Sequence, residues 1–250
     1  MEVYDCSTLM LCVLNNDLKC ASKLLLKKKC EVLSEINTKN NEGNTVLHIA
    51  CRDSLKRGSI EMVKFLLENG ADLHAKNNNN GWTPLHYATV CSSTDTSTVE
   101  LLLRNGADPN VKDNAGRTPL HIAANFSNHH GSSLKTVEVL LQNNANPNVR
   151  TKGYWTPLHN AVLHAKGISS VETVELLLKN GADPNARTCF DMTPIHMVKY
   201  DDNLVKFLLR RGATPIDKKT QIFKLEIDID IFVEANKKLE QRILLLEEED

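Results

Sequence analysis

The sequence predicts an all-α repeat solenoid, and three observations lead to this fold class. A four-residue word, Thr-Pro-Leu-His, recurs along the 250 residues in three exact copies and in two copies with one apolar substitution. Each copy opens an apolar block of helical length, and in most copies a second apolar block follows and ends in a Gly-Ala-Asp turn. The composition, with 41% hydrophobic and 24% charged residues, is typical of a chain that buries a core. Helix pairs that recur in this way bury their apolar faces by stacking on one another.

The recurring word places the start of the first helix in each repeat. We expect its threonine to cap the helix, its proline to occupy the first helical position and its leucine to begin the buried face. At the far end, the Gly-Ala-Asp turn is expected to stop the second helix through a left-handed residue. The five copies of the word begin at Thr45, Thr83, Thr118, Thr156 and Thr193.

This pattern resembles the ankyrin repeat family, which carries the same word at a period of about 33 residues. The resemblance implies a helix, a turn, a second helix and a hairpin in each repeat. We expect an N-terminal capping repeat at 1–36, about five repeats within 37–216 and a helical C-terminal cap at 217–250. The expected repeats span about 37–74, 75–109, 110–147, 148–184 and 185–216.

The repeats are longer than the family period, and the spacing predicts where the extra residues lie. Successive copies of the threonine are 38, 35, 38 and 37 residues apart. The distance from the glycine position of each turn to the next threonine is almost constant, at 12 or 13 residues. The insertions therefore fall between the two helices of a repeat, in polar segments such as 92–97 and 127–133, and the hairpins keep their register.

Both ends of the array are expected to be capped, because a bare terminal repeat would expose an apolar face. Apolar blocks at 9–14 and 21–26 look like the two helices of a degenerate first repeat. Seven apolar residues in 222–246, together with Asn236, follow alternating steps of three and four, which is typical of a helix. We favour helices docked on the last repeat, with a coiled-coil oligomer as the alternative.

Nothing in the sequence predicts a catalytic or metal site. No phosphate-binding loop, nucleophile elbow or zinc-protease word is present, so we expect a non-enzyme without cofactor or metal. The seven cysteines contain no Cys-x-x-Cys pair and are expected to be buried thiols in a reducing compartment. Five of the nine histidines end the repeat word, and the family resemblance implies a structural role for them: His48, His86, His121, His159 and His196.

Two columns of the hairpins are candidates for partner binding. The residue before each threonine is a variable, solvent-facing position in the family, and tryptophan and arginine are enriched in interface hot spots. We expect this pre-threonine column to contact a partner, with packing of each tryptophan across its own hairpin as the alternative. Its members are Asn44, Trp82, Arg117, Trp155 and Met192. The second column, a basic ladder before each hairpin tip, consists of Lys39, Lys76, Lys112, Arg150 and Arg187.

The last two hairpin tips differ from the others in carrying large side chains. Tyr154 and Phe190, together with Trp155 and Met192, are expected to form an exposed apolar patch of the kind that marks binding sites. The basic ladder is expected to meet an acidic protein surface, with a merely solvated edge as the alternative. Nucleic acid is disfavoured, because the net charge is only -1.

The sequence thus predicts a protein-interaction module or scaffold, expected to be a monomer in a cytoplasm. A host-directed effector or regulator, working in the host cytosol, is an alternative; an intracellular bacterium and a large DNA virus are both compatible sources. A nucleic-acid-associated regulator and a coiled-coil oligomer are further alternatives. No apolar run reaches the roughly 18 residues of a membrane span, so no membrane partner is expected.

Overall fold

The computed structural model describes residues 8–27, 36–53, 59–91, 95–126, 134–165, 168–198 and 201–215. The chain divides into two compact units, Met1–Asp183 and Pro184–Asp250. In the described residues all regular structure is helical, which confirms the predicted all-α repeat solenoid. None of the helices in this part of the chain is both long and apolar enough to cross a membrane.

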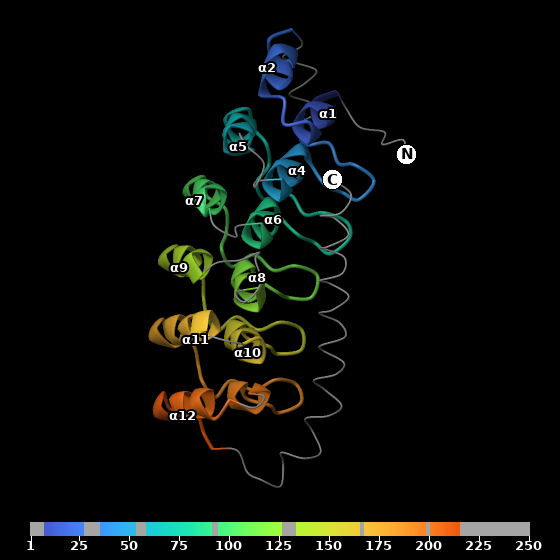
Figure 1. Ribbon diagram of the computed structural model, residues 1–250. Helices are drawn as coiled ribbons and strands as arrows, with labels where there is room; N and C mark the ends of the chain where they lie inside the picture. Colours follow the sequence, from blue (N-terminus) through green and yellow to red (C-terminus); the bar gives the residue numbers. More distant parts are fainter. Residues whose placement is uncertain are drawn as a thin grey trace. The chain divides into compact units, whose positions relative to one another are not determined.

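The first unit is built from two rows of stacked helices (Figure 1). The inner row consists of α4 (Val46–Arg52), α6 (Pro84–Val90), α8 (Pro119–Phe126) and α10 (Pro157–Leu163). The outer row consists of α5 (Ser59–Glu68), α7 (Ser97–Arg104), α9 (Leu134–Gln142) and α11 (Ile168–Lys179). Each helix contacts the next one in its row. Hairpin loops leave the inner row on the side away from the outer row.

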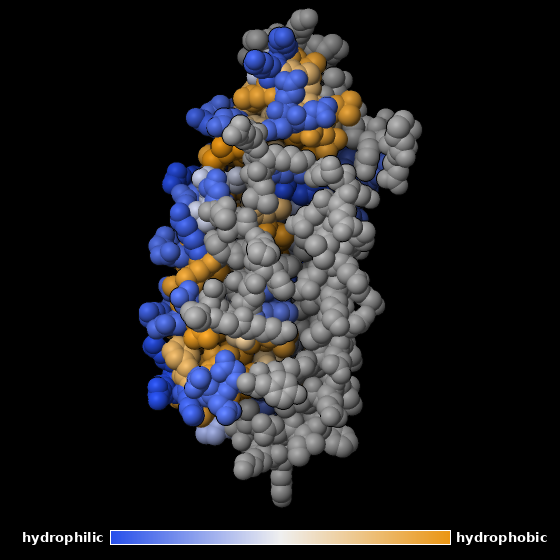
Figure 2. All heavy atoms as spheres, viewed as in Figure 1, coloured by the Kyte–Doolittle hydropathy of each residue, from blue (hydrophilic) through white to orange (hydrophobic). Residues whose placement is uncertain are grey.

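The repeat word produces the core because its leucine belongs to the apolar layer between the two rows. These leucines are at most 1% exposed in the inner helices: Leu47, Leu85, Leu120 and Leu158. Each outer helix contributes a fully buried valine to the same layer: Val63, Val99, Val137 and Val174. The opposite side of the outer helices is mainly hydrophilic (Figure 2), as expected for amphipathic surface helices.

The helix ends follow the predicted chemistry. The capping threonines are extended, for example Thr83 with φ -100° and ψ 167°, and the following proline begins the helix. The turns after the outer helices are left-handed, with φ of 87° at Gly70 and 93° at Gly106. After Gly106, the Ala107 N–H donates to the Leu102 carbonyl at 3.0 Å, which closes the end of the helix.

The expected insertions do lie between the two helices of each repeat. Helix α6 ends at Val90 and α7 begins at Ser97, and α8 ends at Phe126 before α9 begins at Leu134. The N-terminal helices are α1 (Thr8–Leu14) and α2 (Leu18–Lys27), and α1 contacts both α2 and α4. The predicted C-terminal cap at 217–250 lies outside the described residues.

The second unit differs from the predicted repeat in its first helix. The word at Thr193 opens only a 3₁₀ turn, η1 (Pro194–Met197), because Val198 already has an extended backbone. Helix α12 (Asp202–Arg210) follows as the second helix of this repeat. The Asp201 carboxylate caps α12 by accepting from the Asn203 and Leu204 N–H groups, both at 3.0 Å.

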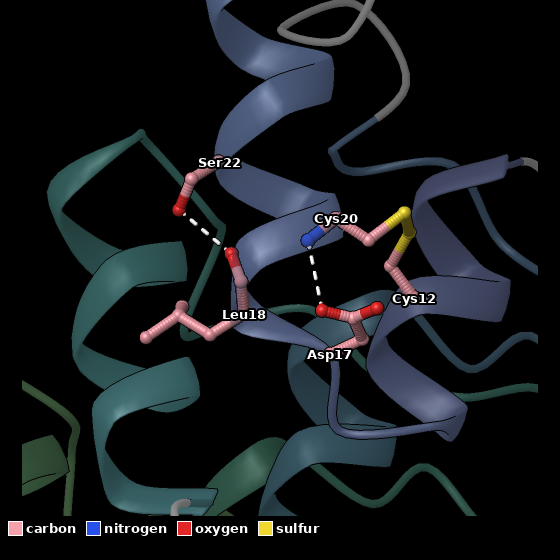
Figure 3. Close-up of a disulfide and its surroundings, with 5 residues drawn as sticks. All are labelled: Cys12, Asp17, Leu18, Cys20 and Ser22. Carbon is pink, nitrogen blue, oxygen red and sulfur yellow. Dashed lines mark hydrogen bonds between the residues drawn. A yellow bond between two sulfur atoms is a disulfide. The ribbon is translucent and has the colours of Figure 1, made fainter.

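The prediction that the cysteines are buried thiols is wrong for several of them. A disulfide joins Cys12 of α1 to Cys20 of α2 across a Cα–Cα distance of 5.9 Å (Figure 3). Cys189 is exposed, whereas Cys51 is a buried free thiol whose pKa is raised by burial. No sequence motif indicated the pairing, because the two bonded cysteines lie eight positions apart on different helices.

Candidate partner-binding surface

Three of the motif histidines connect their repeat to the following one. In the first copy, His48 Nδ1 accepts a hydrogen bond from the Thr45 N–H at 3.1 Å, so the ring proton is assigned to Nε2. That Nε2–H donates to the Trp82 carbonyl of the next repeat at 3.0 Å. His121 makes the same bond to Trp155 at 3.1 Å, and His86 makes a longer one, 3.4 Å, to Arg117. The acceptors are therefore main-chain carbonyls of the pre-threonine column.

Burial keeps these imidazole rings neutral. It lowers the pKa of His48, His86 and His121 from the ordinary value of 6.5 to about 4. The threonine hydrogen bond to Nδ1 recurs at His159 and His196, each at 3.2 Å. Protonation of Nδ1 would remove the acceptor for the threonine N–H, so the neutral ring is the form that fits the fold.

The pre-threonine column does not project into solvent, and that expectation is wrong. Trp82 is 4% exposed and Trp155 is 7% exposed. Asn44 and Met192 are each 1% exposed, so neither offers a side chain to a partner. The family's variable position is thus filled in this chain by side chains that the fold itself covers, and the alternative of a packed tryptophan is the better description.

The contacts of Trp82 explain why a residue of this column is buried. Its indole Nε1–H donates to Asp113 Oδ2 of the next hairpin at 3.2 Å. The ring stacks on His86 at 6.0 Å between centroids and meets Tyr87 edge-on at 5.1 Å. The main-chain N–H donates to Asn77 Oδ1 at 3.0 Å. Trp82 is therefore bonded to its own hairpin and to the hairpin that follows.

Asp113 is the polar centre of that contact. Its side chain is fully buried, and Oδ2 also accepts from Arg117 Nε at 2.7 Å. Its Oδ1 accepts from the main-chain N–H groups of Ala115 and Arg117, at 2.9 and 2.8 Å. Arg117 is consequently occupied by an internal ion pair, with its side chain only 21% exposed.

The hairpin tips of the first unit form a continuous main-chain edge. The Asn78 N–H donates to the Glu42 carbonyl at 2.9 Å, and the Asn114 N–H donates to the Asn80 carbonyl at 2.8 Å. Close approach requires glycine on the preceding tip, since a Cβ on Gly43 (φ 78°) would collide with Asn78.

The fourth and fifth tips replace this glycine with Tyr154 (φ 59°) and Asp191 (φ 63°). Tyr154 is 51% exposed in the first unit, and Phe190 is 49% exposed in the second. Trp155 and Met192 are buried and cannot contribute to the expected exposed patch. Formation of one patch by the two exposed rings stays a prediction.

The basic ladder, in contrast, is exposed in all five repeats. Each of its lysine Nζ atoms donates to the main-chain carbonyl of the next ladder residue, at 2.7, 2.7 and 3.2 Å for Lys39, Lys76 and Lys112 in turn. Arg187 of the second unit pairs with Asp191 at 2.6 Å. Among the described residues, no carboxylate lies within 4.0 Å of the other four cations.

A column of asparagines, whose hydrogen bonds the repeat pattern did not predict, also joins successive repeats. The Asn110 side chain donates to the Asn144 carbonyl at 3.0 Å and accepts from the Asn146 N–H at 2.7 Å. The same pair of bonds is made by Asn37, Asn148 and Asn185. His74 occupies the equivalent position in the second turn and makes neither bond to the described residues. In three turns, an Asn two residues after Asp108, Asn146 or Asp183 was a signal of this column.

The described residues contain no group of three His, Cys, Asp or Glu side chains placed to hold a metal ion. The geometry is instead that of a repeat array with a bonded hairpin edge and an exposed cation column. A family model of ankyrin repeats, in three copies, matches residues 9–113 and 89–188. The chain belongs to the ankyrin repeat family. Ankyrin repeats are generally protein–protein interaction modules and are generally non-catalytic.

Similar segments occur in proteins of different kinds. The human 2-5A-dependent ribonuclease is 42% identical over 71 residues, which cover 28% of this chain and 9% of that protein. Human Rabankyrin-5 is 32% identical over 99 residues, covering 36% of this chain and 8% of the relative. The putative ankyrin repeat protein FPV031 of fowlpox virus is 38% identical over 96 residues, covering 37% of this chain and 26% of the relative. The chain thus spans less than a tenth of the first two relatives.

Proposed function

We propose that this chain is a non-catalytic ankyrin module that holds another protein on its hairpin tips and inner-helix face. The observation that carries the proposal is the basic ladder: it is exposed along the hairpins, and four of its cations have no carboxylate neighbour among the described residues. Charged groups arranged in this way favour encounter with a partner of opposite charge. An acidic protein surface is therefore the proposed partner.

The half-exposed Tyr154 ring adds an apolar contact to the same hairpins. Tyrosine is enriched at interfaces because it combines a large apolar ring with a hydroxyl group. The buried tryptophans have no part in this proposal. We propose a monomer that works in a cytoplasm, either of its own cell or of a host if the chain is an effector; the fowlpox virus relative makes the second setting worth testing.

Site-specific photocrosslinking tests this function. A photoreactive amino acid is placed at Tyr154 on the hairpin side and, as a matched control, at Lys135, which is exposed on outer helix α9. We expect a protein crosslinked from cell lysate at position 154 and none at 135. Crosslinking at 135 alone, or crosslinking of nucleic acid in place of protein at 154, contradicts the proposal.

A further inference from the structure

We propose that the basic ladder of the first unit recognises an extended acidic protein segment with a carboxylate at every third residue. The four cations concerned are Lys39, Lys76, Lys112 and Arg150. The inference rests on the proposed function and adds the chemistry and spacing of the partner. It follows from three properties of the ladder: its fixed positions, its missing counter-charges and its repeat distance.

The lysine head groups are held in place before a partner arrives. Each Nζ is bonded to the carbonyl of the next ladder residue, at 2.7 to 3.2 Å. An ammonium group has three N–H donors, so two remain for a ligand at each position. Because the side chains are already ordered, binding loses less rotamer entropy than it would with free lysines.

The charge of these head groups is not neutralised nearby. Other cations of the chain have a carboxylate partner: Arg117 bonds Asp113 at 2.7 Å and Arg104 bonds Glu100 at 2.8 Å. The four ladder cations have none within 4.0 Å among the described residues. A row of exposed cations attracts anionic groups, and carboxylates form charge-assisted hydrogen bonds with both lysine and arginine.

The distance between ladder positions determines which backbone conformation of a ligand places its charges opposite the cations. Successive cations belong to successive repeats, whose inner helices contact one another, and packed helices lie about 8–10 Å apart. A polyproline II segment rises about 3.1 Å per residue and returns to the same face every third residue, after about 9.3 Å. A β-strand returns after two residues and only about 6.6 Å. Carboxylates three residues apart on a polyproline II segment therefore match the ladder.

The same distance argues against nucleic acid as the ligand. One strand of a duplex carries a phosphate about every 3.4 Å along its axis, so most phosphates would face no cation. An α-helix returns to the same face after one turn, or about 5.4 Å, and after two turns, or about 10.8 Å, so it would drift out of register with a spacing of about 8–10 Å along four positions. An acidic, extended protein segment is the ligand that meets each cation with one charge.

The test uses two labelled peptides with the same composition and fluorescence anisotropy as the readout. In the first, four Glu residues alternate with pairs of Pro; in the second, the four Glu residues are contiguous and the eight Pro follow. With the full chain at low salt, we expect the spaced peptide to bind at least about fivefold more tightly. The triple variant Lys76→Gln, Lys112→Gln, Arg150→Gln should lose about tenfold, since each exposed ion pair contributes roughly two- to fivefold.

Lys135→Gln on outer helix α9 is the matched control and should bind like the wild type; thermal melting checks that the triple variant is folded. Equal binding of the two peptides, no binding of either, or unchanged binding by the folded triple variant would overturn the inference. So would tighter binding of an oligonucleotide with four phosphates. If a protein is crosslinked at Tyr154 and loses affinity for the triple variant, but the spaced and contiguous peptides bind equally, the spacing inference fails while the proposed function stands.

Discussion

Two columns of residues run along the same hairpins and have opposite environments. The pre-threonine column is buried, and its carbonyls and side chains bind the neighbouring repeats, as Trp82 does with His48 and Asp113. The basic ladder lies only a few residues earlier and is exposed. Sequence position on a hairpin therefore does not decide whether a side chain is exposed. What decides it is whether the next repeat supplies a partner that covers the side chain.

The largest expected effect comes from pH and concerns the histidines that bind the pre-threonine carbonyls. The pKa of His48, His86 and His121 is about 4 in the folded chain and near 6.5 when unfolded. Between these values the unfolded chain binds more protons, so stabilisation is complete above pH 6.5 and is lost as the pH falls towards 4. The loss is on the order of 3 kcal/mol per histidine.

Urea unfolding at a series of pH values between 7.5 and 4 checks this prediction. His74→Gln is the control, since His74 is exposed and lies outside the repeat word. A stability that is flat from pH 7 to pH 4.5 would mean that the motif histidines are not held neutral by burial.

Trp82→Ala should destabilise the fold by about 3–5 kcal/mol, because it removes a buried ring from the contact between two repeats. Tyr154→Ala, at the exposed tip, should change the unfolding free energy by less than about 0.5 kcal/mol. Denaturant unfolding measures both. Equal effects of the two substitutions would remove the distinction between the buried column and the exposed tips.

Arg117→Met should cost about 3 kcal/mol, because it leaves the buried Asp113 carboxylate without its charge partner. Arg104→Met is the matched control: Arg104 also pairs with a carboxylate, Glu100, but its side chain is 74% exposed. We expect that substitution to cost under about 1 kcal/mol. The double variant Asp113→Asn, Arg117→Met should recover part of the loss in the same unfolding assay, and a failure to do so would argue against the ion pair.

The asparagine column offers a gain of stability. His74→Asn should restore the two hydrogen bonds that Asn110 makes in the next repeat and stabilise the fold by about 1 kcal/mol. Asn110→His should have the opposite effect. A rise in melting temperature for the first variant and a fall for the second are the expected outcomes. If His74→Asn lowers the melting temperature, an asparagine at position 74 does not make the two hydrogen bonds to the next repeat that Asn110 makes.

The smallest effect is expected for the ladder itself. Lys112→Gln should change the unfolding free energy by less than about 0.5 kcal/mol, because the side chain is exposed and the glutamine amide can donate to the same carbonyl. Thermal melting measures this. A large loss of stability would show that the ladder serves to stabilise the fold rather than to bind a partner.

Local chemistry explains which features could be predicted from the sequence. The threonine caps and the left-handed glycine turns depend on a few neighbouring residues, so the repeat word was enough to place them. The insertions could be placed because the hairpin spacing is constant. The burial of Trp82 could not, since it depends on Asp113, which lies 31 residues away in the next hairpin. The same holds for the Cys12–Cys20 disulfide, which joins two helices whose packing the sequence pattern did not show.

The contrast between the two columns requires that the fold covers the pre-threonine column and leaves the ladder open to a partner. Both tryptophans of the chain, Trp82 and Trp155, lie in the covered column, so their fluorescence reports on it alone. Acrylamide quenching of the folded protein, compared with the protein in denaturant, tests this burial most directly. We predict a blue-shifted emission and weak quenching that become red-shifted and strong on unfolding. Quenching of the folded protein as strong as in denaturant would show that the tryptophans are exposed and would contradict the burial of this column.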